Sequence, residues 1–280
     1  MNIKILSDST CDLPADLLKQ HNITLVPLTV IKGDEQFKDG VTITPAEIFE
    51  HVAKGGSLCT TAANSVGEYK EFFDRYCPDY DGVIVINIGS HFSACYQNAC
   101  IAAADYDNVR VIDSANLSSG QGHVVLKACE LAADCTDLDQ LADELRDYTT
   151  KVEASFLLDR LDYMVKGGRC SSAAALGANL LNLKPCIEVK DGKMSVVKKY
   201  RGNYSKCLAT YVSDRLTNRE DIDRTRIFIT STVVPAETYE AVTEKVNAVG
   251  GFRDVLHSTA GCTVSCHCGP GTLGILFVRK

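Results

Sequence analysis

Three residues of this sequence have the chemical types of a serine hydrolase: Ser93 as nucleophile, His267 as general base and Asp8 as the group that orients the histidine. In α/β-hydrolases the nucleophile lies in a Gly-x-Ser-x-Gly turn that exposes its hydroxyl. The residues around Ser93, from His91 to Cys95, contain no glycine. Hydrolysis by Ser93 and His267 is therefore the alternative, and binding without reaction is the preferred hypothesis.

Threonine hydroxyls precede a helix start in another part of the chain. Thr60 and Thr61 lie in a predicted loop, shortly before a helix for which Ser65 and Glu68 form a capping-box pattern. Helix N-termini favour anions, including carboxylates. The pattern predicts hydroxyl donors for an anionic group.

Ser93 follows a strand pattern of its own. The continuous apolar run Val83–Ile88 predicts a central parallel strand buried on both faces, and a Gly/Ser loop comes directly after it. Asp8 likewise follows a short N-terminal strand. Because ligands of parallel sheets bind at the carboxyl ends of the strands, we expect Ser93, Thr61 and Asp8 to face the same edge.

His267 comes just before a glycine-bracketed bend, Gly269–Gly271, and an apolar strand pattern, Gly274–Val278. Glycine supplies unusual backbone angles and proline fixes one φ, which predicts a tight turn. We expect His267 at the end of a strand, at the edge of a cleft, with a ligand or a second segment close to the backbone.

The cysteines that surround this histidine have an irregular spacing. Cys262, Cys266 and Cys268 form a C-x3-C-H-C pattern with His267, whereas structural zinc sites favour C-x2-C pairs. On a strand, Cys266 and Cys268 would share one face and His267 would lie on the other. The chain has 13 cysteines, an odd number, and we expect reduced thiols and no metal.

Strand, loop and helix patterns alternate through residues 1–152, which predicts a doubly wound parallel-sheet domain. The run Ile23–Ile31 is predicted as its second strand, and a small hairpin insertion is expected near residues 30–42. Residues 153–280 predict an α+β domain. The expected fold class is α/β, with an N-terminal doubly wound parallel-sheet domain plus a C-terminal α+β domain, and the ligand cleft between them.

Composition excludes several classes of function. The formal net charge of −7 argues against nucleic acid as a partner, because phosphate binding needs clustered Lys and Arg. No apolar run approaches the roughly 20 residues of a membrane span, so no stable membrane insertion is expected. The first residues, Met1–Asp8, predict a strand rather than a secretory signal. We expect a cytoplasmic protein.

Four motifs recur together along the chain: Ser7–Pro14, Ser90-x-x-Ser93 with Tyr96-Gln97-x-Ala99, Lys166-Gly167-Gly168-Arg169, and His267-x-Gly269-Pro270-Gly271-x-x-Gly274. In this combination the sequence resembles the DegV family of bacterial lipid-binding proteins nearly end to end. Two stretches depart from the family pattern. The family's Thr-Ser-Gln-Pro-Ser is Thr61–Ser65 here, with Ala62, Ala63 and Asn64, and its Ser-Gly-Thr is Ser93-Ala94-Cys95.

The resemblance implies a non-catalytic protein that holds a long-chain fatty acid in a buried tunnel between two domains. Thr61 and Ser93 would bind the carboxylate, with His267 close to it. A supporting shell of head-group residues would be formed by Asp8, Thr60, Ala94 and Gly269. The fatty acid would be a ligand, and no cofactor is implied.

Some members of the family are the fatty-acid-binding subunit of a bacterial fatty acid kinase, to which they present the carboxylate for phosphorylation to an acyl phosphate. The resemblance implies that Arg169 and Arg201 would then contact the kinase subunit. The apolar helix expected at Ala173–Leu181 would be one wall of the tunnel.

Overall fold

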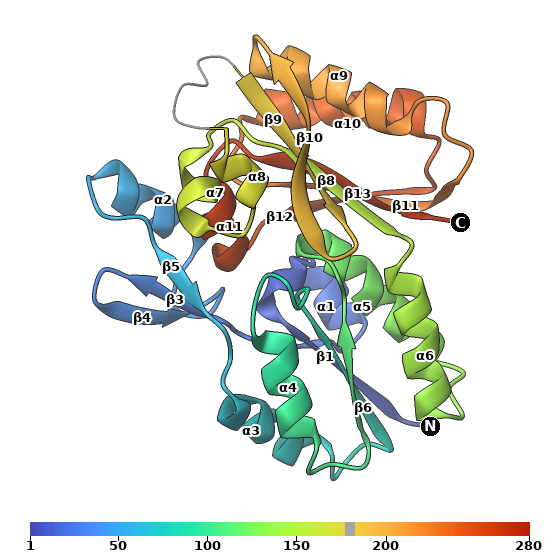
Figure 1. The fold of residues 1–280 in the computed structure, drawn as a ribbon. Helices are drawn as coiled ribbons and strands as arrows, with labels where there is room; N and C mark the ends of the chain where they lie inside the picture. The colour runs from blue at the N-terminus through green and yellow to red at the C-terminus, as the bar shows by residue number, and fades with distance from the viewer. Residues whose placement is uncertain (177–182) are drawn as a thin grey trace.

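The computed structural model describes residues 1–176 and 183–280, and it contains two large sheets in separate halves of the molecule (Figure 1). The sheet of the N-terminal half is parallel, with strand order β2-β1-β6-β7. Its strands, in that order, are Thr24–Val26, Ile3–Asp8, Gly82–Asn87 and Val109–Asp113. All six residues of β6 are buried, as the apolar run predicted.

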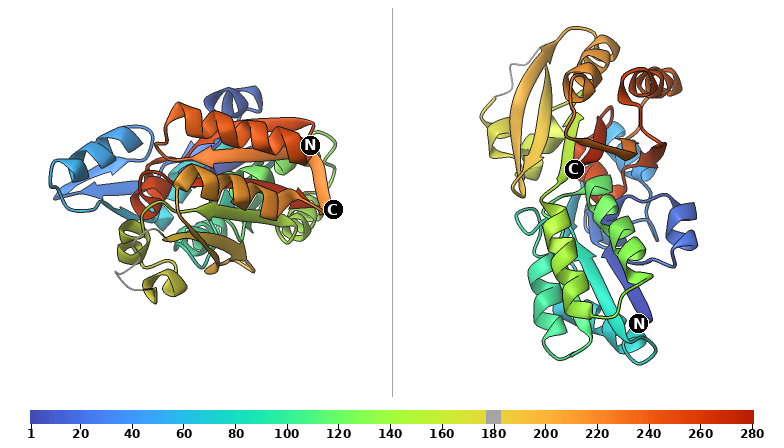
Figure 2. Two further views of the ribbon diagram at one scale, coloured as in Figure 1. Left: turned by 90° about the horizontal axis from the view of Figure 1, so that it is seen from above. Right: turned by 90° about the vertical axis from the view of Figure 1, so that its right-hand side faces the viewer.

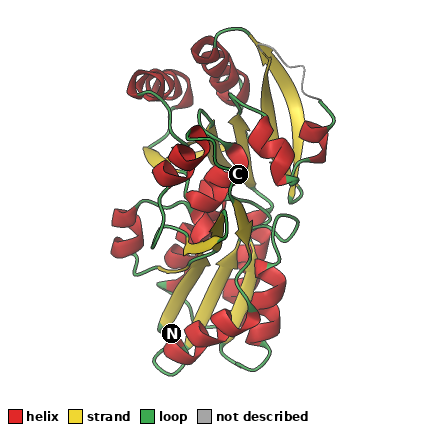
Figure 3. Cartoon of the chain, turned by 90° about the vertical axis from the view of Figure 1, so that its left-hand side faces the viewer, coloured by secondary structure: helices red, strands yellow, loops and turns green. Residues whose placement is uncertain are grey.

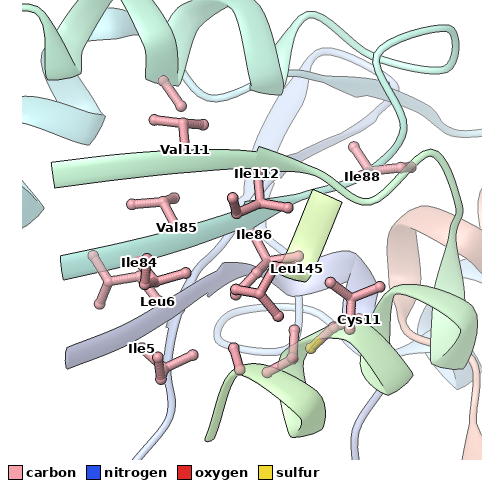
Figure 4. Packing of buried hydrophobic residues seen from close by; sticks show 14 of the residues in the cluster. Ile5, Leu6, Cys11, Ile84, Val85, Ile86, Ile88, Val111, Ile112 and Leu145 are labelled. Atoms are coloured by element: carbon pink, nitrogen blue, oxygen red, sulfur yellow. The ribbon is translucent and has the colours of Figure 1, made fainter. Parts of the chain in front are cut away.

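Helices cover both faces of this parallel sheet. Those of the N-terminal half are α1 (Ala15–Gln20), α3 (Val66–Tyr76), α4 (Cys95–Ala103), α5 (Ser118–Ala132) and α6 (Leu138–Thr149). Helix α4 contacts β6 and β7, whereas α5 contacts β1 and β6. Figure 4 shows the branched side chains of the strands packed in layers against these helices. Helix α5 also contacts strands of the second sheet, so it lies between the two halves.

The sheet of the C-terminal half is mixed, with strand order β10-β9-β8-β13-β11-β12. Its strands, in that order, are Lys193–Arg201, Leu183–Lys190, Val152–Leu157, Leu273–Arg279, Ile222–Ser231 and Asp254–Thr259. Helices α9 (Tyr204–Leu216) and α10 (Ala236–Gly250) lie side by side on its outer face (Figure 2). Figure 3 shows the two halves one above the other. The parallel-sheet and mixed-sheet halves confirm the predicted fold class.

A small antiparallel sheet, β4-β3-β5, projects from the N-terminal half (Figure 1). Its strands are Glu35–Lys38, Thr29–Lys32 and Thr60–Ala62, and α2 (Pro45–Ala53) packs near it. The hairpin predicted near residues 30–42 is its β3–β4 pair. The single strand predicted at Ile23–Ile31 is wrong, because β2 and β3 belong to different sheets. Pro27 lies between them and has no N–H to continue a ladder.

Three further local expectations are corrected. Thr60 and Thr61 lie in strand β5 rather than in a loop, because β5 pairs with β3. His267 lies in helix α11 (Cys262–Cys268), not at a strand end. Residues of α11 with β propensity, such as Thr263 and Val264, favour a strand locally, and tertiary contacts override that preference.

Two short helices, α7 (Asp162–Gly167) and α8 (Ser171–Ala174), follow β8. Of the helix predicted over Ala173–Leu181, only Ala173 and Ala174 belong to α8, because Ala175 and Leu176 form a turn, and residues 177–182 lie outside the described residues. Strand β8 begins at Val152, and the domain boundary expected between residues 152 and 153 stays a prediction. In the described parts of the chain, no helix has the length and apolar character required to cross a membrane.

Candidate functional site

A cavity of about 260 Å³ lies between the two halves. Its lining is mostly apolar and includes Leu28, Ile88, Phe92, Leu117, Met164, Met194 and Val264. The polar lining includes Thr61 and Ser93 from the N-terminal half, and Arg169 and His267 from the C-terminal half. The structure therefore brings the three predicted carboxylate-binding residues into one cavity.

Thr61 and His267 are hydrogen-bonded although 206 positions separate them in the chain. The Thr61 Oγ1 and His267 Nε2 atoms are 2.9 Å apart. Strand β5 holds Thr61 opposite Val30 of β3, and α11 packs against β5. The position of this pair thus depends on how α11 docks on the small sheet.

The His267 ring is neutral near pH 7, because burial lowers its pKa to about 4 and the charge of Arg169 acts in the same direction. Its Nδ1 has no hydrogen-bond partner among the protein atoms of residues 1–176 and 183–280. Gly167 makes this packing possible, since a Cβ at that position would lie 2.4 Å from Nδ1. Within the described part of the chain, Nε2 is the ring atom that takes part in a hydrogen bond.

Ser93 lies just before α4, in the loop that leaves β6. Its Oγ accepts a hydrogen bond from the backbone N–H of Cys95 at 3.3 Å and donates to the Cys95 sulfur at 3.2 Å. A thiol sulfur is a weak acceptor. The serine hydroxyl can therefore turn toward a stronger acceptor in the cavity at little cost.

Asp8 is fully buried and does not line the cavity. Its Oδ2 accepts a hydrogen bond from the backbone N–H of Ile88 at 2.7 Å, and its Oδ1 accepts from the side chains of Thr10 and Gln121. Burial raises the pKa of Asp8, while these hydrogen bonds act in the opposite direction. Asp8 fixes the start of the loop that carries Ser93.

Arg169 lies in the wall of the cavity and remains exposed. Its Nη1 donates to the carbonyl oxygen of Gly167 at 2.7 Å, and its Nε donates to the carbonyl oxygen of Phe92 at 3.4 Å. The second bond connects the two halves. Gly168, at φ 69°, ends α7 in the left-handed conformation and directs the chain to Arg169. A positive charge therefore lies at the polar end of the cavity.

The other residues predicted for the site are distributed differently. Ala94 lines the cavity, whereas Thr60 is exposed on β5 and does not line it. Gly269 ends α11 at φ 75°, and its carbonyl oxygen accepts a hydrogen bond from the Thr232 hydroxyl. Arg201 is exposed at the end of β10, away from the cavity lining.

Comparison with known proteins assigns the family. The profile described as "Uncharacterised protein, DegV family" matches residues 2–280. The chain belongs to the DegV family. A DegV domain-containing protein of Clostridium acetobutylicum is 31% identical over 283 residues, which covers 99% of both chains.

Solved structures of DegV relatives share this fold. A fatty-acid-binding DegV family protein of Thermus thermophilus superposes with a TM-score of 0.89 at 28% identity, and the match covers 100% of both chains. A stearic-acid-binding protein of Eubacterium ventriosum matches with a TM-score of 0.83 at 25% identity, over 99% of this chain and 98% of the other.

The hydrogen bonds of this DegV chain do not form a hydrolase triad. His267 Nε2 contacts the Thr61 hydroxyl, and Ser93 is bonded to Cys95. The Asp8 carboxylate accepts from other groups, among them the backbone of Ile88. Nothing in the described hydrogen bonding links nucleophile, base and acid in series, and the hydrolase alternative gains no support.

The cysteines of α11 lie on a helix, so the strand faces predicted for Cys266 and Cys268 are wrong. Cys262 and Cys266, one turn apart, pack with Cys59 in an apolar cluster, whereas Cys268 packs in another. Burial raises the pKa of each of these helix thiols. All 13 cysteines are free, and no group of metal-ligand residues is found in residues 1–176 and 183–280.

Sequence reasoning missed much of the apolar lining of the DegV cavity. Met164 lies in α7, Met194 in β10 and Leu117 in the loop before α5, and they carry no shared spacing. Methionine fills irregular apolar space with little strain, which is the only signal these residues offered.

Proposed function

We propose that this protein binds one long-chain fatty acid in the cavity between its halves. The hydrocarbon chain would contact the apolar lining, and the carboxylate would lie at Thr61, Ser93 and His267. The observation that carries the proposal is the arrangement of the cavity, which is largely apolar with these polar side chains gathered in its wall. The fatty-acid-binding relatives with the same fold support it.

Burial of the chain supplies most of the affinity. Each CH₂ group transferred from water contributes about 0.8 kcal/mol, so a chain of about sixteen carbons gains on the order of 10 kcal/mol before the cost of association. Met164 and Met194 in the wall adapt their shape to a bent or straight chain. The head group then determines orientation more than affinity.

The tautomer of His267 decides what Thr61 can donate. A proton on Nδ1 would be a buried N–H without a partner, beside Gly167. With the proton on Nε2 instead, His267 donates to Thr61 Oγ1. The Thr61 hydroxyl then keeps its own hydrogen for a carboxylate oxygen of the ligand. Two neutral hydroxyls, those of Thr61 and Ser93, would hold the carboxylate.

Arg169 supplies a compensating charge, because a buried carboxylate without one is costly. We further propose that Arg169 and Arg201 meet a separate fatty acid kinase, to which the carboxylate is presented. Arg169 is suited to both roles, since it lines the cavity and is exposed. The protein itself would remain non-catalytic.

Native mass spectrometry of the purified protein, followed by denaturing extraction, tests the binding proposal. We expect a retained long-chain fatty acid in the wild type and its loss in a Thr61→Val/Ser93→Ala double variant. Thr60→Val is the matched control, because Thr60 neighbours Thr61 on β5 but does not line the cavity. An empty wild type that also takes up no added fatty acid would contradict the proposal.

The kinase proposal has its own test. Arg201→Ala should retain fatty acid binding and reduce acyl phosphate formation by a fatty acid kinase catalytic subunit supplied with ATP. Lipid binding is measured by the same mass spectrometry, and acyl phosphate by its reaction with hydroxylamine. Equal loss of binding and phosphorylation, or no loss of either, would refute a docking role for Arg201.

A further inference from the structure

Helix α11 follows β12 near the end of the chain but packs on the N-terminal half. Cys262 and Cys266 of α11 share an apolar cluster with residues of that half, namely Val30, Ile43, Ile48 and Cys59. The helix also contacts β5, which carries Thr61. The geometry of the Thr61–His267 pair therefore depends on what fixes α11 to the N-terminal half.

Two buried aspartates of the N-terminal half bind the first turn of α11. The first N–H groups of a helix have no partner within the helix. Here Asp12 Oδ1 accepts from the backbone N–H of Gly261 at 2.8 Å, and Asp39 Oδ1 accepts from that of Cys262 at 2.9 Å. Asp39 Oδ2 accepts from the backbone N–H and the hydroxyl of Thr263, at 3.1 and 2.6 Å.

Both carboxylates are themselves fixed within the N-terminal half. Asp12 Oδ2 accepts a hydrogen bond from the Ser118 hydroxyl at 2.5 Å, and Asp39 Oδ2 accepts one from the Ser9 hydroxyl at 3.0 Å. The contact is also close-packed, since a Cβ at Gly261 would lie 2.9 Å from Asp12 Oδ1. The first turn of α11 thus has one docked position.

Burial of two carboxyl groups in an interface costs free energy, which makes them unusual caps for a short helix. Asp12 and Asp39 are only 7% and 4% exposed. Burial raises the pKa of Asp12 to about 8, and the charge of Asp39 adds to the effect of burial. With that pKa Asp12 is mostly protonated at pH 7. A serine or threonine would still cap the helix at a smaller cost of burial. What the two carboxyl groups add is a set of hydrogen bonds that joins α11 to the N-terminal half.

We propose that Asp12 and Asp39 are positioning residues, which orient α11 so that His267 Nε2 faces the Thr61 hydroxyl at the polar end of the cavity. Neither aspartate lines the cavity. The inference rests on the proposed function for its biological meaning, but the geometry that it concerns exists in the ligand-free protein. The inference adds to the proposed function the residues that keep His267 of the C-terminal half opposite Thr61 of the N-terminal half.

The test uses Asp39→Asn and Asp12→Gly in the full-length, delipidated protein. In Asp39→Asn, an amide N–H replaces one acceptor and faces the N–H donors of α11. Glycine suits position 12, where φ is 47°, so that variant removes the carboxylate without backbone strain. The readouts are the ¹⁵N resonances of the His267 ring without ligand and the dissociation constant for oleate.

We expect both variants to shift the His267 Nε2 resonance and to raise the oleate dissociation constant at least fivefold. Asp137→Asn is the matched control, because Asp137 caps α6 through the backbone N–H groups of Asp139 and Gln140 and does not line the cavity. It should leave both readouts unchanged. Thermal unfolding of each variant identifies any that is not folded at the temperature of the assay.

The inference is overturned if either folded variant keeps the wild-type His267 resonances and an oleate affinity within twofold of wild type. A wild type that does not bind oleate is a different result, which contradicts the proposed function. In that case the shift of the His267 resonance in the ligand-free variants still decides whether the aspartates position the ring.

Discussion

His123, which is buried in the core, and His267, which is half-buried in the cavity wall, lie in regions that differ in what surrounds the ring. Burial lowers the pKa of each to about 4, so both rings are neutral near pH 7. His123 lies in α5 between the two sheets, where its Nε2 is 2.9 Å from the carbonyl oxygen of Leu276. Its ring meets Phe228 edge-on, with centroids 5.0 Å apart.

The surroundings of the two rings, rather than their charge states, separate a structural histidine from a binding one. The partner of His123 is a backbone carbonyl of a central strand, which has no hydrogen to pass on to a ligand. The partner of His267 is a hydroxyl in a cavity wall, which can reorient and donate. A perturbed pKa alone would have marked both.

Truncation of His123, whose ring is enclosed in the core, should have the largest effect on stability. His123→Ala leaves a core cavity beside Phe228 and removes the hydrogen bond to the Leu276 carbonyl oxygen, and we expect a loss of about 3 kcal/mol in the free energy of unfolding. Urea denaturation measures it, with the exposed His91→Ala as a control expected within about 0.5 kcal/mol of wild type. The fatty acid affinity of the folded fraction should not change. A loss below 1 kcal/mol would remove the contrast with His267.

Acidification should destabilise the fold by similar amounts through His123 and through His267. In the unfolded chain a histidine titrates near pH 6.5, whereas in the fold both rings titrate near 4. Between these values the unfolded state binds the proton and the folded state does not, so stability falls as pH falls from about 6.5 to 4. Each ring contributes a loss on the order of 3 kcal/mol.

Buried Asp12 has a raised pKa, so its protonation stabilises the fold as pH falls over the same range. The contribution of each histidine is therefore measured by comparing variants with wild type. His123→Gln and His267→Gln should each lose less stability on acidification than wild type does, by similar amounts. Urea unfolding at a series of pH values between 7 and 4 provides the measurement. Curves parallel to wild type would show that the rings are not held neutral.

Replacement of His267 should have the smallest effect on stability, and it should weaken fatty acid binding. At pH 7, His267→Gln should stay within about 1 kcal/mol of wild type in unfolding free energy. The fatty acid dissociation constant should rise about fivefold, which corresponds to one hydrogen bond of about 1 kcal/mol. Calorimetric titration of delipidated protein checks the affinity. If the variant is unfolded, or binds as tightly as wild type, His267 resembles His123 after all.

Local features of the fold could be predicted from sequence. The capping box of Ser65 with Glu68 is present as predicted, because it is formed within four residues. The final strand was also recognised, as a short apolar run after a turn. Such signals need no knowledge of the rest of the chain.

For the carboxylate site, the sequence predicted which residues take part but not the secondary structure that holds them. Thr61 lies on a strand because of its pairing with β3, and His267 lies on a helix whose first turn is capped by Asp12 and Asp39. The contacts of Asp12 and Asp39 with α11 join segments more than two hundred positions apart, and β3 and β5 are separated by a hairpin and a helix, so no local pattern encodes either contact. The resemblance to the DegV family named the residues but did not supply the secondary structure that holds them.

The docking of α11 has a consequence for the order in which the protein can fold during synthesis. The apolar cluster around Val30 and Ile48 is completed by Cys262 and Cys266, which the ribosome adds more than two hundred residues after Ile48. The parallel sheet can form while the chain is still growing, but the small sheet beside it waits for the C-terminal segment. The cavity therefore cannot be complete until α11 has been synthesised, and a nascent chain that ends before Cys262 would lack it.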